Sequence, residues 1–94
     1  MKVVFRIIGQ EEDLTDIDGK EENVHFCFRP SEKNIFELVA KTLKLKRIQL
    51  PSSYHKTISN TTKTLLKMKN INLLTGDVWG HRTDMNKFAE IEIK

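Results

Sequence analysis

Short stretches of alternating apolar and polar residues predict β-strands along this chain. Val24, Phe26 and Phe28 alternate with polar or smaller residues, and Ile48 and Leu50 repeat the pattern further along. Successive side chains of a strand point to opposite faces of a sheet, so such alternation is typical of a strand with one buried face. The sequence therefore predicts a sheet that packs one face against other elements.

Between these strands, apolar residues recur at the spacing of a helix with one buried face. After the first proline this face holds Ile35, Leu38, Val39, Thr42 and Leu43. A second helix is expected to begin near Thr57. Its buried face should hold Ile58, Thr61 or Thr62, Leu65 and Met68. Each amphipathic helix would cover the sheet with its apolar face.

The strand and the helix together form a repeated unit. Pro30 recurs 21 residues later as Pro51, and Ile48 recurs 23 residues later as Ile71. Each proline directly follows a strand and cannot extend its ladder, while the serines after it can cap the next helix. Strands joined by helical crossovers form a parallel sheet. The sequence therefore predicts an α/β fold, a single small domain of three to four repeated strand–helix units with a mainly parallel sheet.

We expect one domain over residues 1–94 because no linker or low-complexity stretch interrupts the pattern. Residues 1–8 are predicted to form the first strand, and residues 9–23 an acidic irregular segment with a short helix at 11–16 and a turn at Asp18-Gly19. Residues 24–89 hold the repeated strand–helix units. The last unit is expected to end in a helix capped by Thr83 that runs through Met85, Phe88 and Ala89.

Composition places the chain among cytoplasmic globular domains. Apolar residues make up 38% and charged residues 31% of the 94 positions, and no run approaches the roughly 18–20 apolar residues of a membrane span. Cys27 is the only cysteine, so no intrachain disulfide can form. Its place in a strand predicts a buried packing residue. A chain this short buries a limited core, which is compatible with a homo-oligomer.

Charge is divided sharply along the chain. Residues 1–37 hold five basic and nine acidic side chains, whereas residues 38–76 hold no Asp or Glu. Eight basic residues form this predicted basic patch: Lys41, Lys44, Lys46, Arg47, Lys56, Lys63, Lys67 and Lys69. Five of them fall near the ends of helices, where the helix dipole favours cations. Stacked units would nevertheless align them as a stripe of like charge, which favours an anionic partner.

Polar residues follow the predicted strands at the edge where ligands usually bind in parallel sheets. They are Arg29, Ser31, Ser52, Ser53, Tyr54, His55, Asp77, Trp79, His81 and Arg82. Helix N-termini at this edge offer free amides to phosphate or carboxylate. Ordinary helix capping by serine explains the Pro-Ser pairs equally well. Trp79 is either a buried side chain that covers the edge of the sheet or an exposed aromatic that binds a ligand.

Catalytic and metal chemistry receive little support from the sequence. Serine, histidine and aspartate are present, but no G-x-S-x-G elbow accompanies them. His55, His81 and Asp77 lack the tight spacing of zinc motifs. Asp16-x-Asp18-Gly19 resembles part of a calcium loop, yet Leu14 stands where a carboxylate is needed. We therefore assign no catalytic residue, no metal and no cofactor.

Four strings stand out beside the repeat: Phe28-Arg29-Pro30-Ser31, Ile48-Gln49-Leu50-Pro51-Ser52-Ser53-Tyr54, Lys56-Thr57-Ile58-Ser59 and Gly76-Asp77-Val78-Trp79-Gly80-His81-Arg82. They resemble an uncharacterised archaeal family of short methanogen proteins, a domain of unknown function. The resemblance covers about residues 24–89, and its last string is the most specific. It implies an archaeal cytoplasmic protein and assigns no activity or catalytic residue. The segment before Asn23 and residues 91–94 have no counterpart in it.

These observations favour a non-catalytic regulatory or interaction module that binds an anionic partner, either nucleic acid or an acidic protein. The partner could also be the acidic segment of a second copy of this chain. The alternative is a protein that binds a small phosphate or nucleotide ligand at the carboxyl edge of the sheet. No membrane partner is expected.

Overall fold

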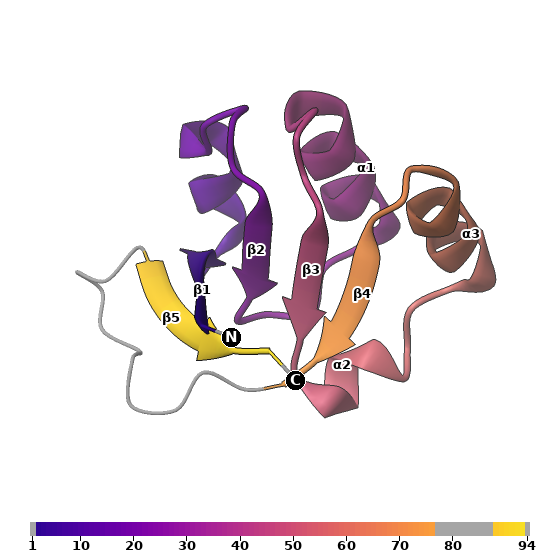
Figure 1. The fold of residues 1–94 in the computed structure, drawn as a ribbon. Helices are drawn as coiled ribbons and strands as arrows, with labels where there is room; N and C mark the ends of the chain where they lie inside the picture. Colours follow the sequence, from indigo (N-terminus) through magenta and orange to yellow (C-terminus); the bar gives the residue numbers. More distant parts are fainter. Residues whose placement is uncertain (1, 77–87, 94) are drawn as a thin grey trace.

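The computed structural model describes residues 2–76 and 88–93. Figure 1 shows the elements in chain order, with η1 a 3-10 helix. They are β1 (Lys2–Ile8), η1 (Glu11–Asp16), β2 (Asn23–Phe26), α1 (Glu32–Lys41), β3 (Arg47–Leu50), α2 (Ser52–His55), α3 (Asn60–Met68), β4 (Asn72–Thr75) and β5 (Phe88–Glu92).

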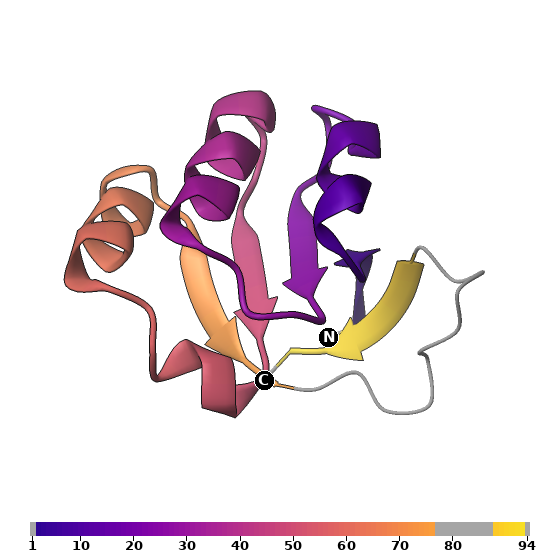
Figure 2. The same cartoon turned by 180° about the vertical axis from the view of Figure 1, so that it is seen from behind.

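The strands form a mostly parallel sheet in the order β4-β3-β2-β1-β5. β1 to β4 are parallel neighbours in chain order, and β5 runs antiparallel along the outer side of β1. Figure 2 shows η1, α1 and α3 on the same face of the sheet, as expected when successive crossovers share one hand. The predicted small α/β domain with a mainly parallel sheet is confirmed, while the number of repeated units stays an interpretation.

The main core lies between the sheet and these helices. Ile8, Val24, Phe26, Ile48 and Leu50 from the three strands β1, β2 and β3 are fully buried there. They pack with helix residues that include Ile35, Leu38 and Leu66. Burying a side chain of this size contributes roughly 1.5–3 kcal/mol, so this layer holds the parallel strands in register.

A smaller cluster covers part of the opposite face of the sheet. Phe5, Ile7 and Ala89 are buried in it, and the partly buried side chains packed against them are Val3, Leu74, Ile91 and Ile93. Leu74 belongs to β4 and Ala89 to β5, at opposite ends of the strand order. The sheet is therefore strongly curved, and its two edge strands approach each other.

The predicted last helix is wrong over its final residues, because Phe88 and Ala89 begin β5 instead. Ala89 pairs with Phe5 and Ile91 with Val3. The alternation of Ala89, Ile91 and Ile93 suits a strand that lays one side on the second cluster. Pairing with β1 also satisfies backbone groups that would otherwise remain open at that edge.

Several side chains predicted as buried are exposed. Met68 is 76% and Leu43 is 87% exposed, since α3 ends at Met68 and α1 ends before Leu43. Cys27 is exposed because β2 stops at Phe26. The second helix begins at Asn60 rather than Thr57, because the Ser59 side chain accepts a hydrogen bond from the Thr62 amide and caps it. The short helix at residues 11–16 is confirmed.

A left-handed residue ends α3 and directs the chain into β4. Asn70 has φ of 59°. The Ile71 amide donates to the Leu66 carbonyl at 2.9 Å and the Asn70 amide donates to the Lys67 carbonyl at 3.1 Å. These two bonds define a Schellman ending, in which glycine or asparagine is favoured at the left-handed position.

Replacing Asn70 should separate backbone strain from the loss of its side chain. Asn70→Ala should lower the free energy of unfolding by about 1 kcal/mol, because a Cβ without a local polar group is disfavoured at positive φ. Asn70→Gly should leave that free energy unchanged or raise it slightly. Urea unfolding followed by circular dichroism measures both, and an equal loss in the two variants would contradict the assignment.

Candidate functional site

The predicted rim site is only partly brought together among the described residues. Asp77, Trp79, His81 and Arg82 lie outside the described residues. Arg29, Ser31, Ser52, Ser53, Tyr54 and His55 all follow the carboxyl ends of β2 and β3. The Arg29 guanidinium carbon lies 5.4 Å from the centre of the Tyr54 ring, so residues of two successive turns do meet at this edge.

Local structure explains the Ser31 hydroxyl at this rim, but the expected capping by Ser52 or Ser53 is absent from α2. Ser31 caps α1: its Oγ accepts from the Asn34 amide at 3.1 Å, and its own amide donates to Asn34 Oδ1 at 2.9 Å. Ser52 and Ser53 are exposed within α2, a four-residue helix capped by Pro51 without a side-chain bond. The capping interpretation of the first Pro-Ser pair is therefore the correct one.

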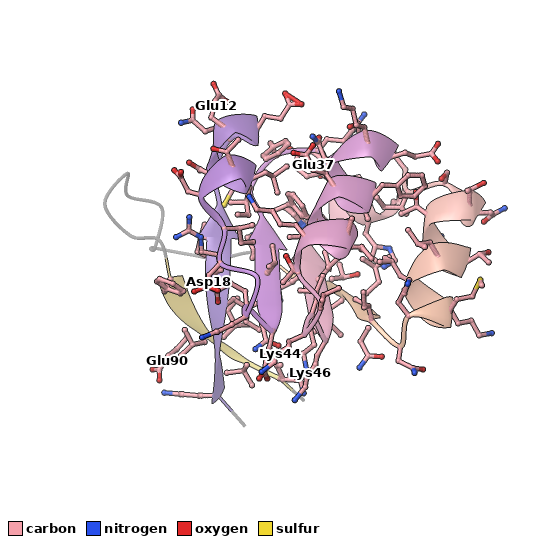
Figure 3. All side chains as sticks on the ribbon, turned by 90° about the horizontal axis from the view of Figure 1, so that it is seen from above. Glu12, Asp18, Glu37, Lys44, Lys46 and Glu90 are labelled. Carbon is pink, nitrogen blue, oxygen red and sulfur yellow. The ribbon has the colours of Figure 1, made fainter. Side chains whose placement is uncertain are left out.

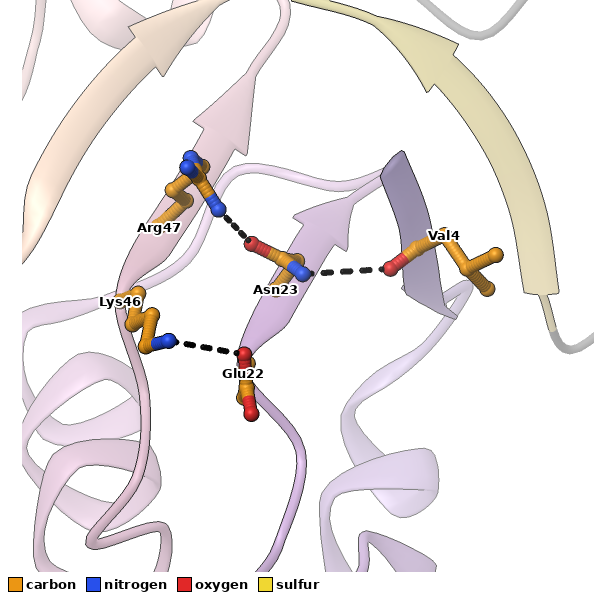
Figure 4. A network of polar contacts seen from close by, with 5 residues as sticks. All are labelled: Val4, Glu22, Asn23, Lys46 and Arg47. Carbon is orange, nitrogen blue, oxygen red and sulfur yellow. Dashed lines mark hydrogen bonds and ion pairs between the residues drawn. The ribbon is translucent and has the colours of Figure 1, made fainter. Parts of the chain in front are cut away.

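Three members of the predicted basic patch have partners within the chain. Lys41 Nζ donates to the carbonyls of Leu14 and Thr15, at 2.7 and 3.0 Å. Figure 4 shows the other two: Lys46 Nζ lies 3.2 Å from Glu22 Oε1, and Arg47 donates to Asn23 Oδ1 at 2.9 Å. These cations secure the acidic segment and the start of β2, so they are not available as one continuous stripe.

A buried arginine lies close to the acidic end of the molecule. Burial raises the pKa of Glu21, with Asp18 adding to the rise and Arg6 opposing it. Arg6 is itself only 6% exposed and stacks on the Phe88 ring, 5.5 Å from its centre. Figure 3 shows Glu12 and Asp18 on the η1 side, across the helix layer from α3.

Four of the remaining five cations of the predicted basic patch gather on the α2–α3 side of the domain, whereas the fifth, Lys44, follows α1. Lys56, Lys63, Lys67 and Lys69 are exposed there. Within residues 2–76 and 88–93, none of the four forms an ion pair, and no Asp or Glu occurs between Leu38 and Gly76. We call these four lysines the α3 lysine cluster. None of the residues that the structure describes compensates its charge, in contrast to the acidic end.

A hollow of about 430 Å³ lies beside this cluster, between α3 and β4. Its residues are His55, Lys63, Leu66, Lys67, Asn70, Ile71, Asn72 and Leu73. Leucine and isoleucine side chains supply an apolar floor, whereas lysine, histidine and asparagine supply the polar rim. Among the six predicted rim residues that the structure describes, only His55 contributes to this α3–β4 hollow. Sequence reasoning missed the hollow because its place depends on which strand forms the edge.

A buried polar pair occupies the face of the sheet that points away from the helices. His25 is 1% and Gln49 is 6% exposed, and His25 Nδ1 lies 2.7 Å from Gln49 Oε1. The two residues are direct register partners on β2 and β3. The sequence signal for this pair is a polar residue at the matching position of two successive strands. The buried His25–Gln49 pair fits a structural role.

Gly76 leaves room for this pair. A Cβ at position 76 would lie 2.5 Å from Gln49 Nε2 and 3.1 Å from Gln49 Cδ. The amide cannot turn away freely, because it is buried and bonded to His25. Glycine is therefore required here by space.

Gly76→Ala should lower the free energy of unfolding by about 1–3 kcal/mol, the usual cost of overpacking. The same substitution in a Gln49→Ala background should cost clearly less, since the clashing amide is gone. Denaturant unfolding of the two single variants and the double variant measures the coupling. Additive losses would refute the proposed clash.

Metal binding and membrane insertion gain no support. Among the residues that the structure describes, no three His, Cys, Asp or Glu side chains lie close enough together to hold a metal ion. None of the helices in that part of the chain combines the length and the hydropathy needed to cross a bilayer.

Comparison with known protein families decides the relationship of the chain. A family model described as the N-terminal domain of the family of unknown function DUF1699 matches residues 4–87. The chain belongs to this family. The expected uncharacterised domain is thus confirmed, while an archaeal source stays a prediction. No curated protein and no solved structure matches the chain.

Proposed function

We propose that this DUF1699 N-terminal domain is a non-catalytic interaction module that binds an acidic protein segment through the α3 lysine cluster and the α3–β4 hollow. The main support is the positive charge of this cluster, because none of its four lysines forms an ion pair with a described residue. Three of the four cations elsewhere in the acid-free segment contact a carboxylate, an amide or carbonyls. The fourth, Lys44, is exposed and does not line the hollow. An acidic partner would supply carboxylates to the α3 lysine cluster, which receives none from the described residues.

The spacing of two lysines strengthens the proposal. Lys63 and Lys67 lie four residues apart on α3, and both line the hollow. Like charges at this spacing destabilise a helix by a few tenths of a kcal/mol. The helix dipole offsets part of this cost for Lys67 in the last turn, but not for Lys63 in the first half of the helix. A carboxylate held between them would relieve the repulsion.

The lining of the hollow favours a protein over a nucleic acid. Leu66, Ile71 and Leu73 offer apolar contact beside the cations, which suits a peptide with both acidic and apolar side chains. Among the residues that the structure describes, no aromatic side chain lines the hollow, so none of them offers a platform for base stacking next to the lysines. Nucleic acid remains an outcome that the experiment below distinguishes.

The alternative of a phosphate or nucleotide site at the rim has weaker support. Ser31 is engaged as a cap, and Arg29 stacks on Tyr54. Only that arginine stack brings charge to the described part of the rim. A rise in melting temperature with inorganic phosphate or a nucleotide, abolished by Arg29→Ala, would favour this alternative.

Charge reversal tests the proposed function. Lys63→Glu combined with Lys67→Glu should weaken binding of fluorescently labelled polyglutamate by about tenfold or more, because two attractions become repulsions. Lys44→Glu is the matched control: Lys44 is exposed and lies in the same acid-free segment, away from the hollow. Its affinity should change by less than about twofold, apart from a general salt dependence.

Fluorescence anisotropy at low salt measures these affinities, with labelled oligo-dT as the nucleic-acid probe. Circular dichroism checks that each variant is folded. Equal losses in the Lys44 variant and the double variant would contradict a local site. Tighter binding of oligo-dT than of polyglutamate, with the same dependence on Lys63 and Lys67, would replace the acidic protein by nucleic acid.

A further inference from the structure

We infer that the acidic partner binds as an extended strand added to the outer edge of β4, with its side chains in the α3–β4 hollow. This inference rests on the proposed function and specifies its mode of binding. It concerns the backbone of β4, whereas the proposed function rests on the charges of α3. The two can therefore fail separately.

β4 is the terminal strand of the sheet order, next to β3 alone. The amides of Asn72 and Gly76 donate inward, to the carbonyls of Lys46 and Leu50. Because backbone groups of a strand alternate between its two sides, the N–H and C=O groups of Leu73 and Thr75 point outward. Within the described residues these amides have no hydrogen-bond acceptor.

The hollow lies directly beside this open edge. Leu73 contributes to both, since its backbone faces outward and its side chain packs toward the main core. Every second side chain of an added strand would face the helix layer. Those side chains would meet Leu66 at the floor and Lys63 and Lys67 at the rim. Backbone pairing would supply affinity and the hollow would supply selectivity, as in other cases of strand addition.

Edge strands usually carry features that prevent pairing with another chain, such as proline, lysine or a bulge. β4 has the sequence Asn-Leu-Leu-Thr and carries none of these residues. The lysines stand on α3 instead, where they repel a basic strand and attract an acidic one. This arrangement selects a partner by charge without closing the edge.

Two peptides test the backbone contribution. The first is an acetylated and amidated peptide of about eight alternating Val and Glu residues, fluorescently labelled. The second has the same sequence with N-methyl groups on every second residue, in both possible phases, which removes donors while keeping charge and side chains. In one phase the N-methyl groups replace the N–H groups that face β4, and this form should bind the full chain at least about tenfold more weakly than the unmodified peptide, as expected from the loss of two or more hydrogen bonds. In the other phase the methyl groups point away from β4, so that form should bind about as tightly as the unmodified peptide.

Thr75→Pro provides the complementary change in the protein. Its outward N–H takes no part in the pairing with β3, so proline is compatible with this edge position. The variant should bind the unmodified peptide about as weakly as the native chain binds the methylated form that lacks the N–H groups facing β4. Thr75→Ala is the control, because it keeps the outward amide and should retain the native affinity. Thr57→Pro is not a suitable control, because the Thr57 amide donates a hydrogen bond to the Tyr54 carbonyl.

The outcomes separate the two proposals. Equal affinity for all the peptides, still lost in the Lys63 and Lys67 double variant, would overturn strand addition and leave the acidic partner intact. No binding of the acidic peptide or of polyglutamate would overturn both. If Thr75→Pro fails to fold by circular dichroism, the methylated peptides alone decide the question.

Discussion

The structure depends on burying one face of a mostly parallel sheet under helices that all lie on the same side. Ile8, Val24, Phe26, Ile48 and Leu50 from three successive strands form the floor of that layer. Because each crossover returns on the same face, the strands are added in chain order and β4 is left at the end of the series. The position of the α3–β4 hollow follows directly from this order.

Electrostatics then differ at the two ends of the helix layer. At the η1 end, Lys41 bonds to the carbonyls of η1, Lys46 pairs with Glu22, and buried Arg6 lies near Glu21. The α3 end holds cations without such partners. The division of charge that is visible in the sequence is thus retained in the fold, but among residues 2–76 and 88–93 only the acidic half is compensated by contacts. This asymmetry is the physical basis for assigning a binding role to α3 and β4.

Much of the fold could be predicted from the sequence, because strand and helix periods differ and the units repeat. The parallel strands at Val24–Phe26 and Ile48–Leu50 and the cap at Ser31 follow from local pattern. The strand at Phe88 was missed because a short apolar stretch fits either period, and only pairing with β1 decides it. The hollow could not be predicted, since no local signal in the sequence states which strand lies at the edge. The basic patch was overestimated for a similar reason, because the contacts of Lys41 and Lys46 join residues distant in sequence.

Amide hydrogen exchange, followed by NMR in the isotope-labelled chain, tests the central claim most directly. Outward amides on an open edge exchange quickly, whereas amides bonded to a neighbouring strand are protected. With an acidic extended peptide bound, the amides of Leu73 and Thr75 should become protected, while those of Asn72 and Gly76 are slow in both states. Protection of Leu73 and Thr75 already present in the free chain, or unchanged rapid exchange when the peptide is bound, would contradict this account.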